Sequence, residues 1–424
     1  MPGAGGLLLP LAALNLAAAF LVQLVVLARI GPGSATDAFM AAATLPQMLA
    51  GMASAVLGSV LVPMLAGESG EQQSSDGWFL LLAVGAIFLA AAALLSLTAD
   101  SWAGWLFPGF SADAARFCAD LARIQVFSMA FAAMNSVLVA VCYARGQFVR
   151  VEAITLLVVG TSAGILYFSL PIHGIVAAAW TVTLTALFQM LLLLPALGRP
   201  RQMGSAARNA SQAWKRIRPL LAGNIYHKSD VVIDRYLLSM AGAGDMTLFA
   251  LAQQFHGAAA GLFGKVWGNT AIPDLAVCAK RGDMPGFVGL YRRRLAILAL
   301  VGGACYILLL IAGQPALALL LGHGKTSAGD IATLWQLMVA SGGVLLFGCV
   351  GVLVAGAYYA LGDTRTPTYL SMASFTLFVA VKYFAFQSFG AIGVALAASG
   401  YFAVNTLFLA GLLPARLRNK VGTR

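Results

Sequence analysis

Five ionisable side chains lie close together in an otherwise apolar region, within residues 224–239, which read NIYHKSDVVIDRYLLS. They are His227, Lys228, Asp230, Asp234 and Arg235. On a helix, His227, Asp230 and Asp234 share one face, while Lys228 and Arg235 lie seven residues apart on a neighbouring stripe. An ionisable group at the centre of a bilayer costs roughly 3 kcal/mol or more, so this cluster predicts partners or a water-filled cavity. Such clusters typically line the path of a polar substrate or ion.

The elements that position this cluster must be membrane helices. Hydrophobic residues make up 60% of the 424 residues and charged residues only 10%, against about 25% charged in a soluble domain. The net charge of +11 does not require a nucleic-acid partner, because the basic residues fall in short loops between apolar runs. We therefore expect a polytopic membrane protein in contact with membrane lipids.

The apolar runs predict an all-α fold with about twelve membrane-crossing helices, each long enough to cross roughly 30 Å of hydrocarbon. They are expected near residues 6–28, 38–66, 78–98, 117–144, 151–170, 174–197, 218–242, 246–275, 294–313, 331–361, 367–387 and 390–413. Most Lys and Arg residues lie after even-numbered spans or in the C-terminal tail. The positive-inside rule then places both termini in the cytoplasm. The first apolar run lacks a basic flank and a cleavage site, so we expect it to remain as a span.

The five cysteines are widely spaced and mostly lie in apolar runs. They are Cys118, Cys142, Cys278, Cys305 and Cys349. We interpret them as buried thiols rather than as disulfide or metal ligands, and we expect no metal site. The sequence also contains no acid/base pair, nucleophile constellation or nucleotide loop, which argues against an enzyme.

Three pairs of segments repeat in order along the chain. They are 37–63 with 245–273, 143–147 with 359–363, and 174–195 with 393–414, at offsets of about 210, 216 and 219 residues. The repeat predicts an N-terminal six-helix lobe (1–198), a basic cytoplasmic linker (199–217) and a C-terminal six-helix lobe (218–424). Because six is even, the two lobes are parallel repeats, which are expected to enclose a central cavity.

Several segments resemble the MviN/MurJ family of lipid II flippases. They are GPGSATDAF at 31–39, VIDRYLLS at 232–239, GLFG at 261–264 and YALGDTRTP at 359–367. The resemblance covers nearly the whole chain. It implies a two-lobed carrier in the bacterial inner membrane that moves a polyprenyl-pyrophosphate-linked glycan precursor from the cytoplasmic to the outer leaflet by alternating access, without a cofactor. We expect a monomer.

Two departures from the family pattern bear on the substrate. Family members usually have fourteen spans, whereas we count twelve here. The family's cavity arginines align with Val22-Gln23, Ala50-Gly51 and Gln253-Gln254. Lys228 and Lys265 lie about ten residues, or roughly 15 Å, from the cytoplasmic ends of their spans. We expect these lysines, with Arg235 further along, to bind the pyrophosphate; the alternative is that they snorkel toward the interface.

The resemblance also suggests a coupling site. In the family, sodium can bind between an acid of the seventh span and groups of the eleventh. Asp234 matches that acid, but the eleventh span offers Lys382. We expect the Lys382 ammonium to stand where sodium would and to pair with Asp234, although Asp234 could instead pair with Arg235. Asp230 is a further candidate for ion coupling, and His227 is a candidate for substrate binding or for proton coupling.

Gln253, Gln254 and His256 on the eighth span are candidate sugar-binding residues. The leading interpretation is a flippase for a lipid II-like precursor. The alternatives are a flippase for an O-antigen or exopolysaccharide precursor and, less favoured because of the lysines, a cation-coupled multidrug exporter. Which lipid-linked substrate is carried, and which ion if any drives transport, stay open at this level.

Overall fold

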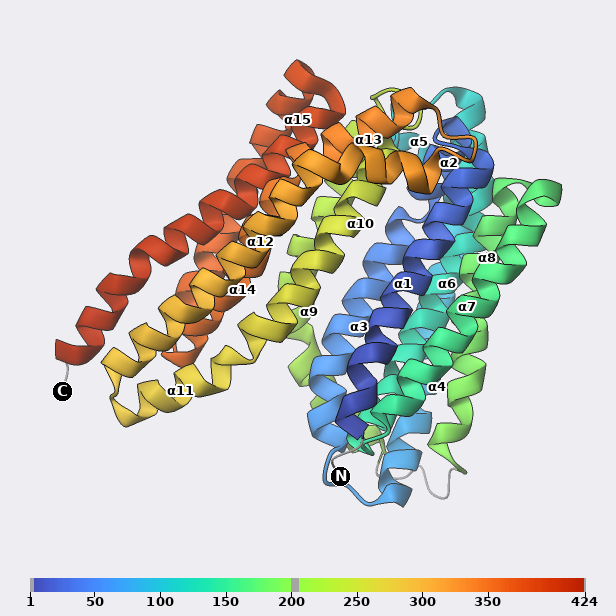
Figure 1. The fold of residues 1–424 in the computed structure, drawn as a ribbon. Coiled ribbons are helices and arrows are strands. Elements are labelled where there is room, and N and C mark those ends of the chain that lie inside the picture. The colour runs from blue at the N-terminus through green and yellow to red at the C-terminus, as the bar shows by residue number, and fades with distance from the viewer. Residues whose placement is uncertain (1–3, 200–205, 423–424) are drawn as a thin grey trace. The chain divides into compact units, whose positions relative to one another are not determined.

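The chain folds entirely into helices in the part that the computed structural model describes, residues 4–199 and 206–422 (Figure 1). The prediction of an all-α polytopic membrane protein is confirmed. Two compact units follow from the packing, Met1–Gly244 and Asp245–Arg424. The predicted division at the linker 199–217 stays a prediction; residues 200–205 of that linker lie outside the described residues, and the helix after it packs with unit 1.

Unit 1 consists of nine α-helices and one short 3₁₀ turn within its described residues. They are α1 (Ala4–Ile30), α2 (Ser34–Ala42), α3 (Thr44–Leu65), α4 (Gly70–Leu97), α5 (Ala99–Leu106), α6 (Ala112–Ala144), α7 (Phe148–His173), α8 (Ile175–Leu193), η1 (Leu194–Leu197) and α9 (Ala206–Leu238). The helix α6 is central, because α2, α3, α4, α5 and α8 all pack against it. Alanines of α6 such as Ala122, Ala130 and Ala133 are fully buried, and small residues of this kind let membrane helices approach closely.

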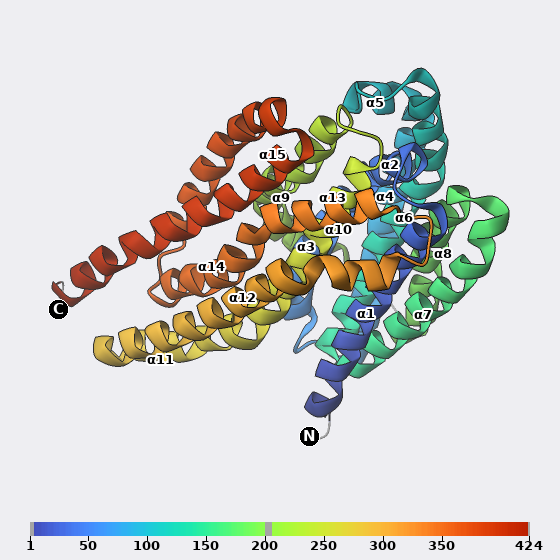
Figure 2. The ribbon, with the colours of Figure 1, turned by 45° about the horizontal axis from the view of Figure 1, so that its top comes forward.

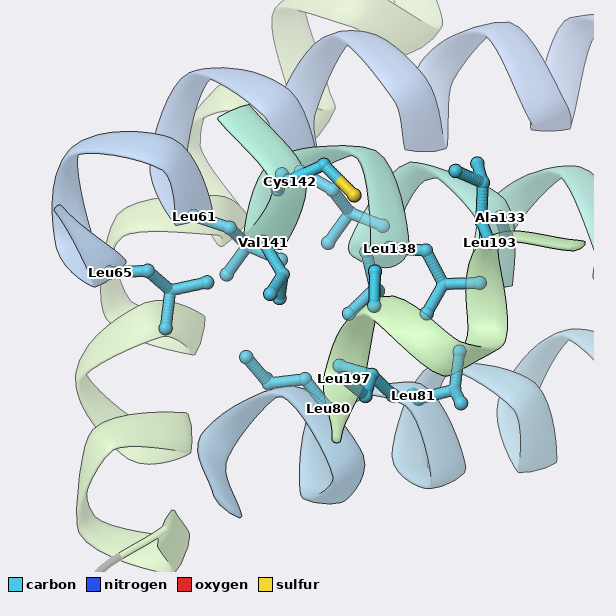
Figure 3. Close-up of a cluster of buried hydrophobic side chains, with 14 of the residues drawn as sticks. Leu61, Leu65, Leu80, Leu81, Ala133, Leu138, Val141, Cys142, Leu193 and Leu197 are labelled. Carbon is cyan, nitrogen blue, oxygen red and sulfur yellow. The ribbon is translucent and has the colours of Figure 1, made fainter. Parts of the chain in front are cut away.

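The core of unit 1 is a cluster of mostly aliphatic side chains from six of these elements (Figure 3). Leu61 and Leu65 of α3 face Leu138 and Val141 of α6, and side chains of α4, α8 and η1 close the cluster. At one end of it, Arg145 follows α6 and donates hydrogen bonds to the Gln73 and Ser74 side chains at 2.9 Å and to the carbonyls of Gly70 and Ala196. One guanidinium thus joins the ends of α4, α6 and η1.

Unit 2 is built around α14. Its elements are α10 (Asp245–Phe263), the π-helical segment η2 (Gly264–Asn269), α11 (Ala271–Arg281), α12 (Met284–Leu321), α13 (Ala328–Ala340), α14 (Gly342–Ala360) and α15 (Arg365–Gly422). The helices α10, α11, α12 and α15 pack on α14, and α11 lies beside α12 (Figure 2). Gly264 and Gly268 of η2 lie against Val352 of α14. Because neither glycine has a side chain, η2 can pack closely on α14.

Nine helical stretches of the described residues are long and apolar enough to cross a membrane. The longest, Arg365–Leu417, is interrupted at Gly390, whose φ of 58° is not helical. This interruption falls where the sequence predicts the end of one span and the start of the next. The charged helix α9 is not among the nine, and the count of twelve spans stays a prediction.

Asp363, in the turn between α14 and α15, forms a small ionic cluster in unit 2. Its carboxylate accepts hydrogen bonds from the amide of Thr366 at 3.0 Å and from the hydroxyl at 2.7 Å, and lies 3.3 Å from Nε of Arg416. Partial burial by itself raises the pKa of this carboxyl. The Thr366 hydrogen bonds and the charge of Arg416 outweigh that effect, so the pKa of Asp363 lies below its ordinary value of 3.8.

We expect this cluster to make the free energy of unfolding depend on pH only at acidic pH. A carboxyl whose pKa is lowered by folding stabilises the fold above its unfolded pKa, and the contribution is lost as pH falls through the folded pKa. The advantage of the wild type over Asp363→Asn in thermal midpoint should therefore be constant from pH 5 to 7 and shrink below about 3.8. Tryptophan fluorescence during heating in detergent measures it. A constant difference down to pH 3 would contradict this assignment.

Candidate transport site on helix α9

The polar stretch recognised in the sequence lies on α9, and its two halves differ in exposure. In the C-terminal half, Asp234 and Arg235 are 7% and 8% exposed. In the preceding turns, His227 and Lys228 are exposed and Asp230 is half-buried. Two kinds of polar group thus follow one another along a single helix. One kind is enclosed by protein, and the other is at least partly exposed.

Arg235 is enclosed by the junction of α2 and α3. The two helices are separated by a single residue, Ala43. The guanidinium donates hydrogen bonds to the Met40 carbonyl, to the Thr44 hydroxyl at 3.0 Å and to the Gln47 side-chain oxygen at 2.9 Å. A cation is favourable at the C-terminal end of a helix, where carbonyl groups lack intrahelical partners. Arg235 therefore stabilises the end of α2 and joins α9 to α2 and α3.

Two further contacts fix the segment that follows α9 to unit 1. The backbone N–H of Gly244, which has a φ of 96°, donates a 2.6 Å hydrogen bond to Asp37 near the start of α2. Gly109, in the loop between α5 and α6, lies directly on the backbone of Ser239 and Met240, so a Cβ there would overlap the Ser239 carbonyl. Asp37 begins the repeated segment 37–63, and Gly244 is one of its partners.

Lys228 extends its ammonium over Gly51 of α3. A Cβ at Gly51 would lie 3.6 Å from the Lys228 Nζ atom. Gly51 is one of the positions at which the sequence departs from the family's arginines, so the structure places a lysine of α9 beside a position where α3 has no side chain. The importance of Gly51 could have been found only by knowing which helix faces it.

Five of the predicted site residues lie in unit 2. His256 is 2% exposed, and its Nε2 atom donates a 2.7 Å hydrogen bond to the carbonyl of Met338 in α13. This contact occupies one ring nitrogen inside the unit. Gln253 and Gln254 are half-buried on α10, and Lys382 is buried on α15. Lys265 belongs to η2, and its side chain lies outside the described residues.

The structure therefore brings Lys228, Asp230, Asp234 and Arg235 together on one helix with Gly51 as a close neighbour. The predicted pair of Asp234 and Lys382 would join a residue of unit 1 to a residue of unit 2, and it stays a prediction. The same holds for the predicted contribution of Lys265, Gln253 and Gln254 to this site.

Comparison with known proteins agrees with this fold. The family model described as lipid II flippase MurJ matches residues 27–422. The chain belongs to the MurJ lipid II flippase family. A curated relative, the lipid II flippase MurJ of Burkholderia cenocepacia, is 23% identical over 402 residues, which cover 89% of this chain and 77% of the relative.

Solved structures show the same fold. A lipid II flippase MurJ in an inward closed conformation matches with a TM-score of 0.82 at 17% identity, covering 97% of this chain and 87% of that one. An inward-facing MATE multidrug transporter of the MOP superfamily matches with a TM-score of 0.77 at 14% identity, covering 96% of both chains. Members of the MurJ family are inner-membrane, multi-pass transporters and not catalysts, so the predictions of localisation and of a non-enzyme are confirmed.

The contact of Gly109 with the end of α9 gives a test of how this helix is held. We expect Gly109→Ala to lower stability by about 1–3 kcal/mol, because the added methyl group overlaps backbone that cannot move without shifting α9. Unfolding can be followed on heating by the reaction of a thiol-specific dye with the buried Cys118 and Cys142.

Gly104→Ala is the matched control, since a Cβ at Gly104 in the neighbouring α5 meets nothing within 4 Å. Its melting temperature should equal or exceed that of the wild type, because alanine is favoured over glycine within a helix. Equal melting temperatures for the two variants would show that the loop does not constrain α9.

Proposed function

We propose that this protein flips a polyprenyl-pyrophosphate-linked glycan precursor, lipid II or a close relative, from the cytoplasmic to the outer leaflet by alternating access. Family membership and the MurJ-like fold support the substrate class. The observation that carries the proposal for this chain is the exposed ammonium of Lys228 over the bare surface of Gly51. The expectations of a monomer and of no nucleic-acid partner remain predictions.

A pyrophosphate needs a cation that can reach it at membrane depth. Lys228 follows about ten residues after the predicted start of its span, which corresponds to roughly 15 Å along a helix. A lysine binds phosphate as a point charge, without the fork of an arginine. We propose that Lys228 supplies the charge that the family places on arginines of other helices, and that Lys265 assists it. Arg235 is left out of this set because it is 8% exposed and hydrogen-bonds Met40, Thr44 and Gln47.

For coupling, we propose that the ammonium of Lys382 replaces sodium beside Asp234. Lys382 is 2% exposed and Asp234 is 7% exposed, and burial of a charged group requires compensation by an opposite charge or hydrogen bonds. If a lysine of the protein already neutralises the acid, transport does not require a bound sodium ion.

Flipping of a fluorescent lipid II in proteoliposomes tests the role of Lys228. We expect Lys228→Ala to slow flipping at least about tenfold, because charge-assisted hydrogen bonds contribute roughly 1.5–3 kcal/mol. Lys228→Arg should retain most of the activity, and Lys228→Ala with Lys265→Ala should abolish it. Lys325→Ala, which removes an exposed lysine from the loop before α13, is the control. Flipping at the wild-type rate by Lys228→Ala would rule out this lysine as the phosphate ligand. If the wild type flips a lipid-linked O-antigen unit faster than lipid II, the O-antigen precursor is the substrate instead.

The same proteoliposomes test the coupling. We expect the flipping rate to be equal in sodium and in potassium buffers, because the acid is neutralised by the chain itself. Asp234→Asn should slow flipping equally in both buffers. A rate that rises with sodium in the wild type, and loses this dependence in Asp234→Asn, would refute the proposed ion pair.

A further inference from the structure

The contacts between α3 and α9 define one fixed alignment of these two helices. Arg235 meets Thr44, with 3.0 Å between Nη1 and Oγ1, and Lys228 meets Gly51. From the first pair to the second, the residue number rises by seven on α3 and falls by seven on α9. This is the relation expected of antiparallel helices whose facing stripes repeat every two turns, a distance of about 10.5 Å.

Of these two contacts, the one at Arg235 is directional. The guanidinium is planar, and its donors meet three oxygens: Nη1 bonds those of Met40 and Thr44, and Nη2 bonds that of Gln47. The group is 8% exposed, so a shift of α9 along α3 would leave buried donors without partners. The contact at Lys228 is different, because a flexible, exposed lysine over a glycine tolerates many positions.

Gly51 contributes by leaving space. The Lys228 Nζ atom lies at van der Waals distance from the place that a Cβ of Gly51 would occupy. The positions one helical turn before and after Gly51 on α3 are Gln47 and Ala55, and both carry side chains. The lysine therefore lies over the bare surface of α3 in this alignment, but its contact does not by itself fix the alignment.

We propose that Arg235 is a positioning residue that fixes the alignment of α9 along α3 and thereby sets the depth at which Lys228 presents its ammonium. Its importance for transport rests on the proposed function, in which Lys228 binds the anionic headgroup. The alignment of the two helices does not rest on the proposed function. Arg235 touches neither substrate nor ion in this proposal, and it acts through the helix that carries Lys228.

Cross-linking measures the alignment directly and without substrate. Two double-cysteine proteins are compared, Gly51→Cys with Lys228→Cys, which is in alignment, and Ala55→Cys with Lys228→Cys, which is one turn out of alignment. Membranes are treated with a short bis-methanethiosulfonate reagent, and cross-linked peptides are quantified by mass spectrometry. We expect the aligned pair to cross-link at least about five times more than the misaligned pair.

The same two pairs are then made in an Arg235→Leu background. We expect the fivefold preference to fall to less than about twofold, because α9 is then free to occupy neighbouring alignments. A preference that is unchanged by Arg235→Leu would overturn the proposal, since a residue that only adds stability would lower the yield of folded protein without altering the ratio. If Arg235→Leu does not insert, Thr44→Val with Gln47→Leu removes two of the acceptors and is judged by the same ratio.

Transport separates this inference from the proposed function. If the ratio falls in Arg235→Leu while Lys228→Ala flips lipid II normally, the positioning role stands and the proposed phosphate ligand is wrong. If the ratio is unchanged while Lys228→Ala is inactive, the phosphate ligand stands and the positioning role is wrong. Both measurements use the full-length chain.

Discussion

Unit 1 depends on the compensation of one buried positive charge. Hydrocarbon offers a guanidinium no hydrogen-bond acceptors, so Arg235 must find them within the protein. It does so at the single-residue break between α2 and α3, where the Met40 carbonyl and the side chains of Thr44 and Gln47 accept its hydrogen bonds. The junction of α2 and α3 supplies acceptors for the Arg235 guanidinium, and the guanidinium in turn stabilises the junction. Either feature alone would be costly within a membrane, and together they join three helices.

This interaction divides α9 by role. Its C-terminal half is held by Arg235, by the loop that carries Gly109 and by the hydrogen bond from Gly244 to Asp37. Its preceding turns carry the exposed His227 and Lys228. A transporter needs a ligand site that is both charged and accessible, and it needs that site on a support that does not drift. In the proposed site, the two requirements are assigned on one helix to residues seven apart, one buried and one exposed.

Much of the fold could be predicted from the sequence, because apolar length is a strong signal in a membrane protein. The all-helical class, the interruption of α15 near Gly390 and the family all followed from apolar runs and short motifs. Individual partners did not follow. The lysine at 228 was found by its charge, whereas Gly51 has no side chain to attract notice and matters only because of what faces it. His256 is a candidate sugar ligand by its type, and its bond to Met338 could not be predicted because it depends on how α10 packs on α13.

The π-helical geometry of η2 has a consequence for how such chains can tolerate insertions and deletions. A π turn accommodates one more residue than an α turn, so Gly264–Asn269 behaves as a helix with one residue inserted. Removing one residue here would restore ordinary α geometry and leave the helix downstream in the same phase, because the wide turn takes up the extra residue locally. Ala271 and Leu275, which are fully buried in unit 2, would then keep their neighbours. This segment is therefore a place where the chain can gain or lose one residue without changing which face of α11 is buried, and related sequences that are one residue shorter here are expected to bury the same face.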